Sequence, residues 1–113
     1  MTPRTSLSIS PPYAVEKAIA NFGTNLRKAR LRRNLTVAQL AAKLGVGRHV
    51  VANAEGGKPT TSIGVYVGAL WAMNLLHTLD AVANPKSDEE GLALASLDER
   101  ERSRPGRGPS NDF

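Results

Sequence analysis

Cysteine is absent from the sequence, and this excludes a disulfide framework, a zinc finger and a thiol nucleophile. Two histidines, His49 and His77, are too few for a histidine-rich metal site, so we expect no metal and no cofactor. Aromatic residues make up only 4% of the 113 residues, so any core must be aliphatic and modest in size. No apolar run reaches the about 18 residues of a membrane span, and residues 1–12 lack the apolar region of a signal peptide. We therefore expect a small cytoplasmic protein.

Enzymatic activity is also disfavoured. The sequence offers no nucleophile and base in a recognisable context and no cofactor fingerprint, so we expect no catalytic residues. A chain of this size can bury a core for four or five short helices but hardly enclose a substrate.

Charge is divided unevenly along the chain. Residues 17–58 hold nine basic residues and a single acid, Glu55, whereas residues 80–101 hold seven acids and two bases. A basic half suits a polyanion such as nucleic acid, and an acidic half does not touch the same polyanion. The alternative is that these charged residues lie on ordinary solvent-exposed helix faces and bind no partner.

Apolar spacing predicts an all-α fold with five helices from about Tyr13 to Val82. The first helix has an apolar stripe in which Gly23 is expected to produce a kink or a break; the stripe consists of Val15, Ile19, Phe22, Leu26 and Ala29. Thr36 and Gln39 form a capping box for a short helix that buries Leu40, Ala41 and Leu44. Gly45 ends that helix, and a three-residue turn leads to a helix from Arg48 to about Glu55, which Gly56 and Gly57 stop.

Two further helices complete the predicted domain. Thr61 or Ser62 caps the fourth, which carries Ile63, Val67 and Leu70 on one face and ends at Asn74. The fifth is short and ends at Asn84-Pro85; its apolar residues are Leu75, Leu76, Leu79 and Val82. Residues 87–90 predict a second capping box, before a strip containing Leu92 and Leu97. The predicted divisions are a disordered arm at 1–12, a domain at 13–83, and an acidic helical segment with a flexible tail at 84–113.

Residues 37–54 carry a helix-turn-helix pattern. Two helices that cross steeply need a small residue where they pass, here Ala41, and a residue that permits the turn, here Gly45. The apolar residues that close the small core between them are Leu40, Leu44, Val46, Val51 and Ala54.

Together with Arg30, Leu35-Thr36 and Glu55-x-Gly57-Lys58-Pro59, this pattern resembles the Xre/Cro repressor family over roughly residues 22–82. The resemblance implies a lambda-repressor-like domain that binds double-stranded operator DNA. The runs 57–64 and 70–76 are similar to the HipB-like branch, antitoxins that regulate their own operon with a HipA-type kinase toxin. Such a protein would be nucleoid-associated when bound to DNA. The alternatives are a solitary Xre-type regulator and a protein-binding adaptor that has lost DNA binding. Operator binding that weakens steeply with salt would distinguish a DNA-binding repressor from the adaptor.

The family reads bases with the helix after Gly47, which implies base-reading roles for Arg48, His49, Ala52 and Asn53. The side chains suit these roles. Arg48 can donate two hydrogen bonds to guanine, Asn53 can form two hydrogen bonds with adenine, and Ala52 can contact a thymine methyl group. Two alternatives remain open: Arg48 contacts only a phosphate, and His49 makes no contact with DNA. Val37 stands where the family usually has a phosphate-binding Gln, and Gly47 where many members have Ser or Thr. Contacts with the DNA phosphates are then expected from Arg27, Lys43, Lys58 and main-chain N–H groups.

Three further expectations concern contacts. Arg30 and Glu55 are predicted to form a structural ion pair, because Glu55 is the lone acid of its region and the family resemblance implies the contact. A homodimer is predicted, because one recognition helix covers only a few base pairs; its candidate interface residues are Trp71, Leu75, Leu76 and Leu79. Residues 80–101 are predicted to face a protein partner rather than DNA; the alternative is that they pack on their own domain.

Overall fold

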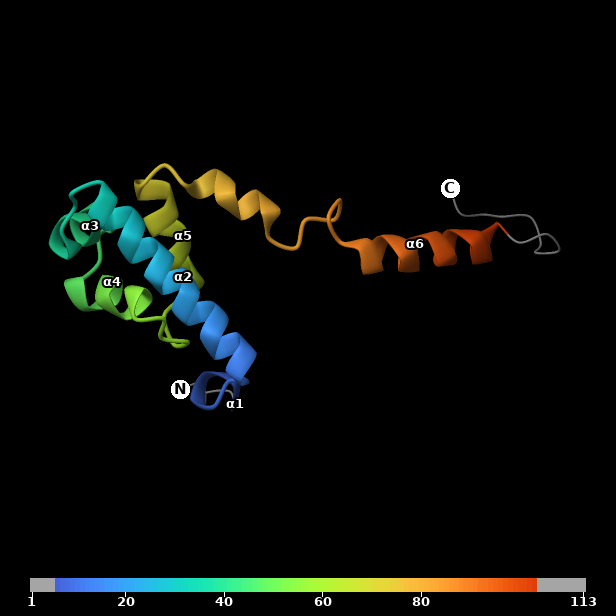
Figure 1. Ribbon diagram of the computed structural model, residues 1–113, viewed down its shortest axis with the longest axis horizontal. Helices are drawn as coiled ribbons and strands as arrows, with labels where there is room; N and C mark the ends of the chain where they lie inside the picture. Colours follow the sequence, from blue (N-terminus) through green and yellow to red (C-terminus); the bar gives the residue numbers. More distant parts are fainter. Residues whose placement is uncertain (1–5, 104–113) are drawn as a thin grey trace. The chain divides into compact units, whose positions relative to one another are not determined.

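The computed structural model describes residues 6–103, in which every regular element is a helix and no strand occurs (Figure 1). The helices are α1 (Ser6–Ile9), α2 (Tyr13–Arg32), α3 (Val37–Leu44), α4 (Arg48–Glu55), α5 (Ile63–Ala72), the 3₁₀ helix η1 (Leu76–Ala81) and α6 (Glu89–Arg102). The predicted all-α class is therefore confirmed. None of these helices is long and apolar enough to cross a membrane.

The chain divides into two units, residues 1–77 and residues 78–113. The division falls six residues before the boundary at 83/84 that the sequence suggested, because the compact helices end near Leu75 and η1 buries no residue. Within the first unit α2 packs on α4, α3 packs on α4 and α5, and α4 also contacts α5.

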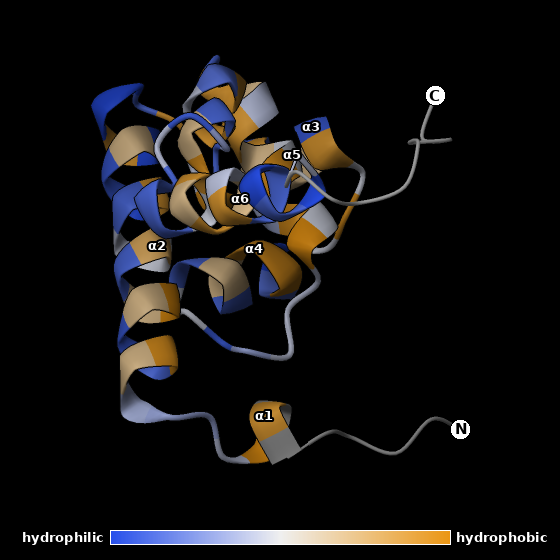
Figure 2. Cartoon of the chain, turned by 90° about the vertical axis from the view of Figure 1, so that its right-hand side faces the viewer, coloured by the Kyte–Doolittle hydropathy of each residue, from blue (hydrophilic) through white to orange (hydrophobic). Residues whose placement is uncertain are grey.

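Helix α2 runs unbroken through Gly23, so the predicted break does not occur. Leu26 and Ala29 of the predicted stripe are buried, while its first three residues are half-buried. Hydrophobic and hydrophilic residues follow one another turn by turn along α2, as a helix with one buried face requires (Figure 2). Gly23 is instead a point of close approach: a Cβ built there would lie 2.5 Å from the carbonyl oxygen of Ala54.

The helices and the turn between Thr36 and Gly57 form as predicted, but Leu44 and Val46, which were expected in the core, are only half-buried. The Thr36 hydroxyl accepts from the Gln39 backbone N–H at 3.0 Å, and the Gln39 side chain accepts from the Thr36 N–H at 2.8 Å, so the capping box is complete. Gly45 ends α3 in the left-handed conformation, with φ at +67°. After the turn, α4 spans Arg48–Glu55, which is the predicted range.

The core of the first unit is aliphatic apart from one tyrosine. The largest fully buried side chains are Leu26, Leu40, Val51 and Met73, and they are accompanied by smaller buried residues and by Tyr66. Tyr66 packs on the ring of Phe22, with 4.9 Å between the ring centroids, and donates a hydrogen bond to the Lys58 carbonyl at 3.3 Å. Neither Tyr66 nor Met73 was foreseen as a core residue.

Helix α5 buries a different face from the predicted one. Tyr66, Ala69 and Leu70 are buried, whereas Ile63 is 68% exposed and Val67 only half-buried. Every residue of α5 is apolar or small except Tyr66, so the helical period alone does not reveal which side faces the core. Asn74 follows in the left-handed conformation, as predicted, with φ at +60°. Ser62 occupies the N-cap position without making a side-chain cap hydrogen bond.

The structure differs from the predictions in three places near the ends of the chain. The arm expected to lack structure contains the one-turn helix α1, and residues 1–5 and 104–113 lie outside the described residues. The fifth helix is the 3₁₀ helix η1, with Leu76 and Val82 exposed. The N-cap of α6 is Asp88 rather than Ser87, because the Asp88 carboxylate accepts from the Gly91 N–H at 3.0 Å.

Candidate nucleic-acid interface

Helix α4 has one buried side and one exposed side. Val51 and Ala54 are buried against the rest of the first unit, each 2% exposed. The predicted base-reading residues lie on the opposite side, at positions one, two, five and six of the helix: Arg48, His49 and Ala52 are exposed and Asn53 is half-buried. Because positions four apart share a face of a helix, the structure brings these four residues onto one continuous surface.

The N-terminal end of α4 is electropositive. Gly47, the N-cap residue, offers no side-chain acceptor, and the first turn has no acidic residue. The N–H groups at a helix start attract anions, and here Arg48 adds a full positive charge. This end of α4 is therefore suited to approach a polyanion.

The histidine at position 49 does not extend away from the protein. A Cβ built on Gly47 would lie 2.8 Å from two atoms of the His49 ring, so the imidazole folds back over the N-cap residue. A Ser or Thr cap at position 47 would require the exposed His49 ring to turn away from this position. The folded-back position of the ring also weakens the case for His49 as a base-reading residue.

The predicted phosphate contacts come from three separate elements, and all are exposed: Arg27 on α2, Lys43 on α3 and Lys58 in the loop after α4. Between residues 17 and 77 the sequence has no acid except Glu55, which is committed to Arg30. These three exposed bases therefore have no free neighbouring acid along the sequence to neutralise them. The structure does not link the three residues to one another by any contact.

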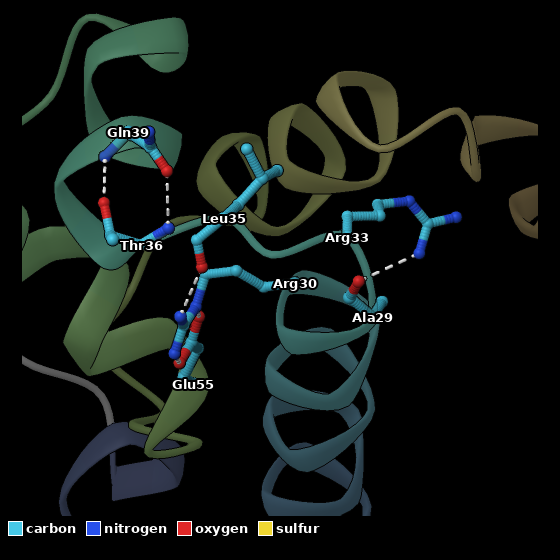
Figure 3. Close-up of polar contacts among 7 residues, drawn as sticks. All are labelled: Ala29, Arg30, Arg33, Leu35, Thr36, Gln39 and Glu55. Carbon is cyan, nitrogen blue, oxygen red and sulfur yellow. Dashed lines mark hydrogen bonds and ion pairs between the residues drawn. The ribbon is translucent and has the colours of Figure 1, made fainter.

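The predicted ion pair between Arg30 and Glu55 is confirmed, and it is buried (Figure 3). The guanidinium donates to the two carboxylate oxygens at 2.6 and 3.0 Å, and its third contact is to the Leu35 carbonyl at 2.8 Å. The two side chains are 9% and 8% exposed. The hydrogen bond to Glu55 raises the pKa of Arg30 above its ordinary value, against the opposing effect of burial.

Two glycines reinforce this junction between α2 and the end of α4. Gly23 of α2 lies against the carbonyls of Ala54 and Glu55, and a Cβ on Gly57 would lie 2.5 Å from the Cα of Ala20. Gly57 also has φ at +67°, which favours glycine. Sequence reasoning treated Gly23 as a helix breaker, although a glycine inside an apolar helix stripe is also the signature of close backbone packing.

The predicted dimer residues differ in exposure. Trp71 is 60% exposed and Leu76 is 41% exposed, whereas Leu75 and Leu79 are half-buried. Within residues 6–103 no cluster of three or more His, Asp or Glu side chains is arranged to hold a metal ion. Comparisons with protein-family models, with curated proteins and with solved structures found no match.

Proposed function

We propose that the chain is a sequence-specific DNA-binding transcriptional repressor in which α3 and α4 act as a helix-turn-helix. The observation that carries this proposal is the exposed side of α4, where Arg48, Ala52 and Asn53 share one surface while Val51 and Ala54 anchor the other side in the core. An α-helix of this kind fits the major groove of double-stranded DNA. The double-stranded operator is the proposed ligand, and no cofactor is part of the proposal.

Each side chain on this surface has a definite chemistry toward base edges. The Arg48 guanidinium matches the two acceptors of guanine, the Asn53 amide matches the donor and acceptor of adenine, and the Ala52 methyl fits a thymine methyl. Arg48 is exposed and stands at the start of the helix, the end that enters the groove first. We therefore assign the strongest base contact to Arg48 and give His49 no more than a supporting part.

Phosphate contacts would hold the helix in register. Lys58 is the best placed by the fold, because its N–H is bonded to the Asn53 carbonyl at 3.1 Å and the loop is thus fixed to the end of α4. Arg27 and Lys43 would contribute from the two neighbouring helices. Such contacts carry affinity but no sequence information.

The direct test is a pair of alanine variants measured on an operator selected from random double-stranded DNA. Arg48→Ala is expected to cost about 1–3 kcal/mol on the selected site and to relax preference at one base. Lys58→Ala is expected to weaken selected and random DNA alike and to flatten the dependence on salt between about 50 and 200 mM. If Arg48→Ala weakens both DNAs equally, Arg48 is a phosphate contact. If the unchanged protein binds no DNA at low salt, the adaptor alternative replaces the repressor.

A second part of the proposal is that this repressor is the antitoxin of a HipA-type kinase and acts in the cytoplasm, on the nucleoid while bound to DNA. The supporting observation is α6, an acidic helix whose three leucines are all exposed: Leu92, Leu94 and Leu97 are each between 53 and 60% exposed. The predicted strip of Leu92 and Leu97 is wrong, because five residues place them about 140° apart on a helix. Leu94 and Leu97, three residues apart, are the pair that shares a face.

Truncation after Pro85 tests this second part. Operator binding should survive, because α4 and the core that holds it lie in the first unit, whereas co-purification with the kinase should be lost. Retention of the kinase by the truncated chain would move the contact to the first unit. A chain that binds its operator but never retains such a kinase would be the solitary regulator.

A further inference from the structure

A small cavity lies in the first unit between α2, α5 and the loop that joins α4 to α5. It has a volume of 170 Å³, and its wall is almost entirely apolar. Its lining residues include Ile19, Phe22, Lys58, Pro59, Ile63 and Tyr66. None of them belongs to the exposed side of α4, so the cavity is separate from the surface proposed to read bases.

The hydroxyl groups beside the cavity already have partners. The Tyr66 phenol donates to the Lys58 carbonyl at 3.3 Å, and the Thr61 side chain hydrogen-bonds to the same phenol. The Tyr66 ring packs against the Phe22 ring, with 4.9 Å between the centroids. The wall therefore offers aromatic and aliphatic carbon to a ligand, and no hydroxyl there needs a new partner.

The loop side of the cavity is fixed by its backbone. The Lys58 N–H donates to the Asn53 carbonyl at 3.1 Å, and the Thr61 N–H donates to the Lys58 carbonyl at 3.0 Å. Gly57 holds the start of the loop against α2, since a Cβ there would lie 2.5 Å from the Cα of Ala20. A ligand would thus meet walls that are already ordered, and it would not have to offset the entropy of ordering them.

The volume of the cavity limits the size of its occupant. An apolar cavity of about 150 Å³ in another protein takes up one benzene ring, so a cavity of 170 Å³ has room for a single aromatic ring. Phe22 and Tyr66 favour an aromatic ring over an aliphatic group, because neighbouring rings gain from edge-to-face and offset contacts.

Lys58 decides the charge of the occupant. Among the lining residues it is the only charged one, and it is exposed. Its flexible side chain allows the ammonium group to meet an anion at the mouth of the cavity. The segment 17–77 has a single acid, Glu55, which is bound to Arg30, so an anionic ligand would meet no free carboxylate from this segment.

We propose that this cavity binds a small aromatic monocarboxylate, whose ring fills the apolar space and whose carboxylate pairs with Lys58. The regulatory consequence rests on the proposed function, in which Lys58 contacts a DNA phosphate. The ligand and DNA then compete for one ammonium group, so the ligand weakens DNA binding. By linkage, DNA weakens ligand binding by the same factor.

The first test measures ligand binding without DNA, with benzoate as the probe. The chain has three isoleucines, of which Ile19 and Ile63 line the cavity and Ile9 lies in α1. In NMR spectra of isoleucine methyl groups, benzoate should shift the Ile19 and Ile63 signals with one dissociation constant of about 0.1–1 mM. The Ile9 signal should stay in place.

Two further probes test the proposed ligand chemistry. Benzamide has the same ring without the charge and should bind about three- to fivefold more weakly, as expected for the loss of an exposed ion pair. Isovalerate has the carboxylate on a branched aliphatic chain and should also bind more weakly than benzoate. Tighter binding by benzamide would overturn the role of Lys58, and tighter binding by isovalerate would overturn the aromatic class.

Variants locate the site. Ile63→Gln should weaken benzoate binding at least about fivefold, because an apolar wall is lost. Ile9→Gln is the matched control: the two isoleucines are 68 and 67% exposed, so the same change is made at an equally exposed position, and benzoate should bind as before. Lys58→Met should reduce benzoate binding to the level of benzamide and leave benzamide binding unchanged. Ile19 remains as the reporter in all three variants.

The second test measures affinity for double-stranded DNA at constant ionic strength, with sodium benzoate replacing sodium chloride. Saturating benzoate should weaken DNA binding by the unchanged protein at least about fivefold, a typical coupling between two sites. It should have no effect on Lys58→Met, which lacks the shared ammonium group. An equal effect of benzoate on both proteins would overturn the competition for Lys58.

The two tests separate the cavity from the repressor. Absence of shifts at Ile19 and Ile63 up to about 10 mM benzoate, or equal shifts at all three isoleucines, would overturn the site even if the chain binds DNA. Specific shifts in a chain that binds no DNA would support the site and refute the repressor. Specific shifts with unchanged DNA affinity would overturn the regulatory consequence.

Discussion

Removing the Glu55 carboxylate should destabilise the fold before it affects the proposed DNA binding. Glu55→Ala leaves the Arg30 guanidinium with only the Leu35 carbonyl as a partner, at a site where the side chain is 9% exposed. Breaking a buried pair by deleting one member costs about 3–5 kcal/mol, because the remaining charge stays buried without compensation. A folded unit of this size has a total stability of only about 4–10 kcal/mol, so the loss is a large part of it.

Thermal unfolding followed by circular dichroism measures this cost. A change of 1 kcal/mol moves the Tm of a domain this small by roughly 4–8 °C, so Glu55→Ala should lower the Tm by at least about 12 °C. Asp98→Ala is the control, because it deletes the carboxylate of the Asp98–Arg102 pair, whose side chains are 61 and 68% exposed. An exposed pair contributes about 0–1 kcal/mol, so this variant should unfold close to the unchanged protein.

The double variant Arg30→Met, Glu55→Leu separates charge burial from packing. With both charges gone the desolvation cost disappears, so the double variant should be more stable than Glu55→Ala, with the Leu35 carbonyl as the one group that loses its donor. An unchanged Tm for Glu55→Ala would refute the structural role of the pair. A double variant less stable than either single one would refute the argument from the stranded charge.

Three further changes test the packing of the first unit. Gly23→Ala should destabilise by about 1–3 kcal/mol in urea unfolding, because its Cβ would collide with the Ala54 carbonyl, although alanine is the better helix former; a stabilised variant would contradict this close approach. Thr36→Ala should cost about 1 kcal/mol in the same assay and Thr36→Ser almost nothing, since only the hydroxyl completes the capping box. Burial raises the pKa of Tyr66 above its ordinary value of 10.0, so the folded state holds the phenol proton more tightly than the unfolded chain. The stability from this group should be complete below about pH 10 and be lost as pH rises through the raised pKa; Tyr66→Phe should lack that alkaline loss, which equal losses in both proteins would disprove.

The sequence predicts the segment 36–57 most closely because its signals are local. The capping box, the left-handed Gly45 and the end of α4 each depend on residues within one or two turns, and each forms as expected. The Arg30–Glu55 contact joins residues 25 apart and was still predictable, because Glu55 is the single acid in a basic region and the family resemblance implies the same partner.

What the sequence did not predict depends on contacts between distant segments. The buried face of α5 is decided by where α3 and α4 lie, since the helix is apolar on every side, and Tyr66 and Met73 were missed for that reason. Gly23 has a role only because α4 ends against it. The position of the His49 ring over Gly47 depends on the side-chain rotamer, which the spacing of residues in the sequence does not predict.

The attachment of α4 is unequal at its two ends, and this has a consequence for its motion. The last turn is held by the Arg30–Glu55 pair and by two glycine contacts with α2, whereas the first turn begins at Gly47 without a side-chain cap. Fraying should therefore start at Arg48 and progress toward Ala54, and amide hydrogen exchange should slow steadily in that direction. In the proposed DNA complex Arg48 would then adjust its position while Ala54 stays fixed, so the helix would adapt by bending its free end rather than by shifting as a whole.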